Sequence, residues 1–234
     1  MKITHFQLKH LISETIKNIL SERKFDPRTL DQMNFSSLSK MILYVKDKLG
    51  LMPLGQGSAR TVFLLDSKRV LKIAMNAKGL AQNEAEIKLS LNLVADTVIA
   101  KIFDYQKDNK WLISELVRPL KSEAEFKELT GVSFAFITYL MYIKSEFRHE
   151  AIEHIKESIN YGATHYRDYA KTAKELETQT KIPIFAHILR VVDDPQINLV
   201  LADINKVDHW GKTPDQRVVL LDYGFTEEVE ARYY

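Results

Sequence analysis

The side chains best suited to chemistry in this chain of 234 residues are three aspartates near its end and one lysine far upstream. Asp222 directly follows an apolar run, Val218–Leu221, which is typical of a buried strand, so its carboxylate is expected at the mouth of that strand. Asp208 and Asp203 lie shortly before it, and Lys72 interrupts another apolar run. Carboxylates suit magnesium and a lysine suits phosphate oxygens, so the set points to a triphosphate–magnesium site.

Two glycines add to this hypothesis. Gly55 and Gly57 come just before an apolar hairpin, where glycine allows the backbone to approach phosphate oxygens closely, and Ser58 adds a hydroxyl donor. Arg60 stands where a dinucleotide fingerprint needs its third glycine, and the GxxxxGK[ST] phosphate loop is also absent. An ordinary turn fits the same two glycines.

Lys72 is expected to point to the side of its strand opposite its apolar neighbours. The lysine either lies exposed on the outer face of the sheet or is held beneath the glycine turn, paired with phosphates and an acid. Glu84 and Glu86 follow on the next predicted helix. Glu86 is the preferred partner because Ile87, which follows it, would pack that helix inward.

Magnesium usually takes one or two carboxylates together with phosphate oxygens and waters, a need that Asp208 and Asp222 would meet. A third acid near the transferred group, Asp203, would orient a hydroxyl or accept its proton. Alternatively, Asp203 and Asp208 are ordinary loop acids, and Asp222 begins a turn with Gly224.

Composition narrows the classes of protein. Net charge is +2 with both signs spread along the chain, so neither a nucleic-acid partner nor a membrane surface is indicated. The chain has no cysteine, which removes disulfides, thiol catalysis and zinc–thiolate sites and fits a reducing, cytoplasmic compartment. The first residues carry charges throughout and match neither a signal peptide nor a membrane span.

Hydrophobic periodicity predicts an α+β chain. Its first 50 residues read as helical, with a break at Asp26-Pro27 and a second helix that Ser37 would cap. A small antiparallel sheet with one helix follows, and then a mainly helical segment. The expected strands are 61–65, 69–74, 98–103, 110–115, 199–202 and 218–221; the expected helices after residue 50 are 79–94, 123–129, 134–161, 166–179 and 184–192.

The order and spacing of these motifs resemble the protein-kinase-like superfamily, over roughly residues 53–118 and 184–225. The resemblance consists of a glycine loop, a strand lysine, a helix acid, a hinge, a catalytic loop and a metal motif. In sequence order these are Gly55–Val62, Lys72 within Val70–Ala74, Glu86, Ile113–Leu116, Asp203–Asp208 and Asp222–Gly224.

The resemblance implies ATP and Mg²⁺ as cofactors and assigns roles to the residues. Lys72 would contact the α- and β-phosphates and pair with Glu86, and Asp203 would be the catalytic base. Asp208 stands where the family usually has asparagine, and Asp222 would hold the bridging magnesium. The backbones of Glu115 and Val117 would contact adenine.

The implied architecture is bilobal. Residues 1–50 would form a helical N-terminal extension, 51–118 a β-rich nucleotide-binding lobe, and 119–234 a mainly helical lobe with the catalytic and metal loops. The site would lie in the cleft between the lobes.

The sequence also departs from the family. Leu201-Ala202 replaces the His-Arg pair before the catalytic aspartate, and few residues follow Asp222, so no activation segment is expected. This arrangement looks more like small-molecule phosphotransferases or the compact kinase-like proteins of phage and bacterial genomes.

Four functions remain open at this point. The first is an ATP- and Mg-dependent phosphotransferase with an unknown acceptor, protein or small molecule. The second is a kinase-like pseudoenzyme that binds or regulates a protein. The third is a nucleotidyl transferase, and the fourth is a helical interaction protein that binds no nucleotide.

Overall fold

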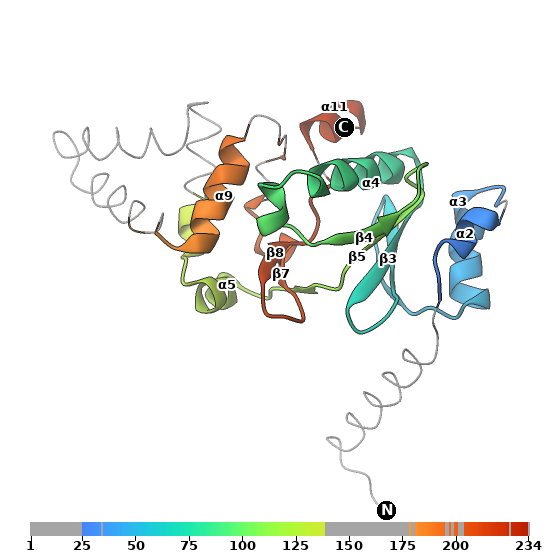
Figure 1. Ribbon diagram of the computed structural model, residues 1–234, viewed down its shortest axis with the longest axis horizontal. Helices are drawn as coiled ribbons and strands as arrows, with labels where there is room; N and C mark the ends of the chain where they lie inside the picture. The colour runs from blue at the N-terminus through green and yellow to red at the C-terminus, as the bar shows by residue number, and fades with distance from the viewer. Residues whose placement is uncertain are drawn as a thin grey trace, which may run out of the picture. The chain divides into compact units, whose positions relative to one another are not determined.

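The computed structural model describes residues 25–33, 35–138, 178, 181–194, 197, 199–200, 204–224 and 226–233. They form an α+β fold built on antiparallel sheets (Figure 1). The chain divides into two compact units, the first comprising Met1–Leu80 with Ile102–Leu116 and the second comprising Ala81–Lys101 with Val117–Tyr234. The domain boundaries expected from the sequence stay a prediction.

The first unit is built on a five-stranded sheet in which every neighbouring pair is antiparallel, in the order β1-β2-β3-β5-β4. The predicted hairpin forms, and Asp66 closes its turn by accepting a hydrogen bond from the backbone N–H of Lys68 at 2.8 Å. The strands are β1 (Pro53–Gln56), β2 (Arg60–Leu64), β3 (Arg69–Ala74), β4 (Ile102–Tyr105) and β5 (Trp111–Glu115).

One face of this sheet carries the unit's core, because alternate side chains of its strands point to the same side. The helical segments before the sheet pack on that face: α2 (Thr29–Gln32), α3 (Leu38–Leu43) and the π-helical turn η1 (Tyr44–Lys48) (Figure 1). Ser37 caps α3 as predicted, since its hydroxyl accepts from Lys40 N at 3.3 Å. The core residues are Leu30, Met41, Val45, Leu51, Phe63, Leu65, Leu71, Ile73, Trp111 and Ile113.

The strands differ from the sequence prediction at two places. Pro53–Gln56 was not among the expected strands but forms β1, where proline is tolerated because it is the first residue of an edge strand. The strand expected at 98–103 begins only at Ile102. Upstream of it, Ile99 instead forms an isolated parallel bridge with Leu220 in the second unit.

Helix α4 (Ala77–Ser90) follows β3 directly, close to the helix expected at 79–94. It begins in the first unit, and its residues from Ala81 onward belong to the second. Asn76 accepts a hydrogen bond from the backbone N–H of Gly79 at 3.1 Å, which satisfies a donor of the helix's first turn.

The second unit contains a three-stranded antiparallel sheet in the order β6-β7-β8, formed by Arg118–Pro119, Trp210–Lys212 and Val218–Leu220. Its helices are α5 (Glu123–Thr130), α9 (Pro183–Asp193) and α11 (Glu227–Tyr233), with 3₁₀ turns η2 (Ala95–Thr97) and η3 (Val207–His209). Phe126 lies at the centre of its core, edge-on to Phe134 and Trp210, with ring centroids 5.1 and 5.5 Å away.

The sequence predicted α5, α9 and β8 within one or two residues, whereas β6, β7 and α11 were not expected. Residues 134–138 are helical, as predicted. The rest of the helix expected at 134–161, almost all of 166–179 and part of the strand at 199–202 lie outside the described residues, although Leu199 forms an isolated bridge with Thr226. No helix in the described part of the chain is long and apolar enough to cross a membrane.

A pH-dependent contact stabilises the start of α5. Glu125 accepts a hydrogen bond from the Arg118 side chain and another from the backbone N–H of Lys121 at 2.9 Å, and both lower the pKa of its carboxyl below the ordinary value. A lowered pKa contributes stability that is present above the unfolded-state value, about 4.3, and is lost as pH falls through the folded-state value.

We therefore expect Glu125→Gln to lower the melting temperature at neutral pH, with the difference from wild type shrinking below about pH 4.3. The check is a melting series by pH with Glu128→Gln, an exposed carboxylate on the same helix, as control; an equal gap at every pH would contradict it.

Candidate functional site

Lys72 lies in the middle of the first unit's sheet, on the face opposite the core. The strand register joins Gly55 to Val62, Val62 to Lys72 and Lys72 to Leu112, and residues directly opposite each other in antiparallel strands share a face. Gly55 is therefore two strands from Lys72 in the same row, roughly 10 Å away. Only 7% of the Lys72 surface is exposed, so this is not the solvent-facing lysine that the sequence left open.

A buried ammonium group costs free energy unless another group compensates its charge. Lys72 has at least one interaction within the protein. The same is true, separately, of Glu86, Glu115 and Asp222. A lysine held inside a sheet in this way has a fixed position, which is the property that a phosphate contact requires.

Ser114 shares the Lys72 face and was not singled out from the sequence. It pairs with Val70 in the register and is wholly buried. Among the described residues its hydroxyl has no hydrogen-bond partner. A buried hydroxyl without a partner on this face is a candidate ligand contact, and only strand register and burial together reveal it.

The two glycines were expected to lie in a turn, but only Gly57 does. Gly55 belongs to β1, and the turn to β2 is closed by Gly57, whose N–H donates to the carbonyl of Arg60 at 2.9 Å. Ser58 is exposed at the tip, and its carbonyl accepts from Asn76 Nδ2 at 2.9 Å. A Cβ added at Gly55 would meet nothing within 4 Å, so the protein itself leaves open space beside this backbone.

The two residues expected to present backbone groups to adenine lie at the end of β5 and just beyond it. Glu115 is the last residue of the strand, buried and paired with Arg69. Val117 lies two residues later and is half-buried. The second unit begins again at this residue. The intervening N–H of Leu116 donates to the carbonyl of Lys68 at 2.7 Å and so ties the segment to the β2–β3 turn.

Helix α4 distinguishes the two candidate acids. Glu84 has 47% of its side chain exposed and forms an ion pair with Lys88 at 2.8 Å. Glu86 is completely buried. A carboxylate without solvent must find its compensation within the protein, so the structure holds Glu86, the residue preferred from the sequence, as the inward-facing acid.

Asp222 lies in a segment that contacts the same side of α4. A Cβ at Gly224 would come within 2.6 Å of the carbonyl oxygen of Gln82, which is one helical turn before Glu86. Tyr223 is buried, and its hydroxyl donates to the carbonyl of Ala100 at 2.7 Å. These contacts fix the position of the backbone that carries Asp222.

Asp208 and Asp222 lie at the same end of the β7–β8 hairpin. Trp210 pairs with Leu220, and the N–H of Leu221 donates to the carbonyl of His209 at 2.9 Å. Asp208 directly precedes His209 in the 3₁₀ turn η3, and Asp222 directly follows Leu221, so the two acids flank this last hydrogen bond of the hairpin. Asp208 is exposed and Asp222 half-buried, so both carboxylates have access to an ion.

This donor set fits magnesium, which binds one or two carboxylates and completes its shell with phosphate oxygens and waters. No group of three or more acidic or histidine side chains arranged to hold a metal occurs in the part of the chain that the structure describes. The third predicted acid, Asp203, lies outside the described residues, so its role stays a prediction. The segment before Asp208 is tied to β7, because Trp210 Nε1 donates to the carbonyl of Ile204 at 2.8 Å.

Comparisons with known proteins give little further guidance. No protein-family model matches the chain, and no curated protein matches it. Among solved structures it is similar to the ternary complex of streptomycin, ATP and APH(2″)-IIa, with a TM-score of 0.37 and 15% sequence identity over 82% of this chain and 71% of that one. A TM-score of 0.37 does not establish a shared fold.

The close contact at Gly224 predicts a measurable effect on stability. Gly224→Ala would force a Cβ against the backbone of Gln82, which cannot move without displacing α4, so we expect a loss of about 1–3 kcal/mol in the free energy of unfolding. The control is Gly55→Ala, whose Cβ enters open space and should leave the melting temperature unchanged. Equal denaturant midpoints for Gly224→Ala and wild type would show that the Asp222 segment is not pressed against α4.

Proposed function

We propose that this chain binds ATP with magnesium and transfers a phosphoryl group, as a member of the protein-kinase-like superfamily. The observation that carries the proposal is the buried Lys72 on the face of the sheet opposite the core, in one row with Gly55. Burial of a lysine costs free energy that its partners must offset, and it gives the ammonium the fixed position from which it could bind phosphate oxygens.

The order of elements around Lys72 supports the same proposal. In protein kinases a glycine-rich loop covers the phosphates, the phosphate-binding lysine lies on the third strand, and it pairs with a glutamate on the next helix. Here the glycine turn joins β1 to β2, Lys72 lies on β3, and α4, which follows β3 directly, carries a buried acid, Glu86.

Each group then has one task. Lys72 binds the α- and β-phosphates and Glu86 orients it by an ion pair. Asp208 and Asp222 hold magnesium, which neutralises charge on the phosphates, and Asp203 accepts the proton of the acceptor.

The nucleotide's other contacts come from the backbone and the glycine turn. The backbones of Glu115 and Val117 bind adenine. Gly55, Gly57 and Ser58 cover the phosphates. The acceptor is a small molecule or a protein.

The test is intact-mass analysis of the chain and of candidate acceptors after incubation with ATP and MgCl₂, together with measurement of ADP. Addition of phosphate with release of ADP is the expected result. Addition of AMP would instead identify nucleotidyl transfer, and nucleotide binding without any transfer would identify a pseudoenzyme. A chain that neither binds nor consumes ATP would contradict the proposal.

A further inference from the structure

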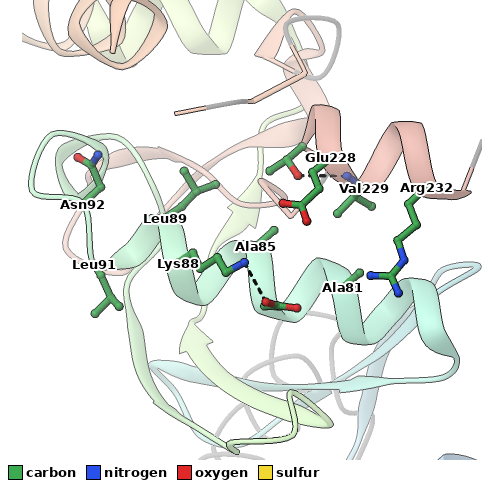
Figure 2. A pocket seen from close by; sticks show the side chains of 11 residues that line it. Ala81, Ala85, Lys88, Leu89, Leu91, Asn92, Glu228, Val229 and Arg232 are labelled. Atoms are coloured by element: carbon green, nitrogen blue, oxygen red, sulfur yellow. Dashed lines mark hydrogen bonds and ion pairs between the residues drawn. The ribbon is translucent and has the colours of Figure 1, made fainter. Parts of the chain in front are cut away.

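The second unit has a groove between helices α4 and α11. It encloses about 320 Å³, and Figure 2 shows α4 along one side with α11 along the other. Residues that decide its character are Ala81, Ala85, Lys88, Leu91, Val229 and Arg232. None of them has a task in the proposed phosphoryl transfer.

The floor of the groove is apolar and shallow. Ala81, Ala85 and Leu89 follow one another at intervals of four along α4, so they share one side of the helix. Val229 faces them from α11 and is buried (Figure 2). The alanines leave room above the helix that larger side chains would fill, and so the groove can receive an apolar group from another molecule.

Exposed leucines extend this apolar surface past the end of α4. Leu91, which lines the groove, is 71% exposed, and Leu93, two residues on, is 89% exposed. Together with the groove's apolar floor, these leucines form continuous exposed apolar surface, which marks interaction sites. The patch reaches beyond the cavity, which favours a protein occupant over a small molecule.

The charged residues around the groove are balanced. Glu84 and Lys88 form an ion pair, which holds the pKa of the Lys88 ammonium above its ordinary value. Glu228 and Arg232 lie one turn apart on α11. The charge of Glu228 also helps to raise the pKa of Lys88, and the Arg232 guanidinium lies 5.5 Å from the Tyr233 ring centroid. Two acids and two bases line the groove, so a second copy of the same surface can place a base opposite an acid.

We propose that the α4–α11 groove is the interface through which two copies of this chain form a two-fold dimer. In a two-fold interface the same patch serves both subunits, so residue i of one copy meets residue j of the other, and the reverse contact forms as well. Glu228 of one copy pairs with Arg232 of the second, and the reciprocal pair forms by symmetry. The Leu91 and Leu93 side chains of each copy cover the alanine floor of the other. This inference does not depend on the proposed phosphoryl transfer.

The first experiment measures the mass of the full chain in solution by sedimentation velocity over a series of concentrations. Wild type is expected to sediment as a dimer that dissociates on dilution, and Leu91→Glu and Leu93→Glu as monomers that keep the circular dichroism spectrum of wild type. Leu43→Glu is the matched control, because Leu43 is an exposed leucine in the first unit and should leave the dimer intact. A monomeric wild type, or a dimer that survives Leu91→Glu, would overturn the proposal and leave the groove to another protein.

The second experiment tests the paired charges. Glu228→Arg gives a chain with two bases at the facing positions, and Arg232→Glu gives one with two acids, so each alone is expected to remain monomeric. An equimolar mixture is expected to recover a heterodimer, because each arginine then faces a glutamate. Both substitutions are at exposed positions of α11, so folding is not at risk. A mixture that stays monomeric while wild type dimerises would overturn the proposed contact.

Discussion

The Asp222→Asn variant is expected to keep its fold and to lose magnesium-dependent nucleotide binding and turnover. The backbone around Asp222 is held by the Tyr223 hydroxyl and by the contact of Gly224 with α4, and neither involves the substituted carboxylate. Asparagine keeps the size of the side chain but removes the negative charge that magnesium requires. Loss of a group that stabilises transition-state charge lowers kcat by about 10²–10³-fold. The measurement is ATP turnover against MgCl₂ concentration, with affinity for ATP followed in parallel.

Asp215→Asn is the control for this substitution. Asp215 lies at the opposite end of the β7–β8 hairpin, where its carboxylate accepts from the Thr213 hydroxyl and lies beside Arg217. The Thr213 hydrogen bond lowers the pKa of Asp215, so the control is expected to lose some stability at neutral pH while its magnesium dependence stays that of wild type. Unchanged magnesium dependence in folded Asp222→Asn would remove this residue from the metal site.

Replacement of Lys72 is expected to have an effect of similar size, but on nucleotide binding with or without metal. The side chain is buried on the face of the sheet opposite the core, in the same row as Gly55. No other lysine in the five strands of this sheet can take over its contact with the phosphates. Lys72→Met keeps the apolar stem and removes the ammonium, and we expect kcat/KM for ATP to fall by at least about 10²-fold. Lys72→Ala should lose as much activity and also some stability, because it leaves a cavity.

Lys68→Ala is the matched control, because Lys68 lies exposed in the turn that precedes the same strand. Its removal should leave both ATP binding and stability close to wild type. If Lys72→Met binds ATP as wild type does, the burial of this lysine has a structural cause and the proposed nucleotide site is wrong.

Much of the first unit could be predicted because its pattern is local. The alternation around Leu71, Lys72 and Ile73 gives the face of each side chain, and Ser37 gives the start of α3. Burial of Lys72 could not be predicted, since period-two alternation assigns a face but does not say what covers it. Similarly, β1 was missed because Pro53 and Gly55 favour turns, and only pairing with β2 makes this segment a strand.

The second unit was harder to predict because its sheet depends on distant pairing. Strand β6 has two residues, Arg118–Pro119, and pairs with residues more than ninety positions later in β7, so neither strand has a signal of its own. Without β7, the sequence could not show that Asp208 and Asp222 lie at one end of a hairpin. The inward position of Glu86 rather than Glu84 was predictable, because the apolar neighbour Ile87 sets the inward side of the helix, whereas the pairing of Glu86 with Lys72 stays a prediction.

The most direct test of the central claim is the melting temperature of the wild-type chain with ATP and MgCl₂, compared with ATP and EDTA. A ligand that binds only the folded state raises its stability, by about 2.7 kcal/mol when its concentration is 100-fold above Kd. For a chain of this size the expected rise is roughly 5–10 °C with magnesium, a smaller rise with EDTA, and none in Lys72→Met. An unchanged melting temperature at millimolar ATP and MgCl₂ would contradict the claim that Lys72 and Asp222 bind a magnesium-bound nucleotide.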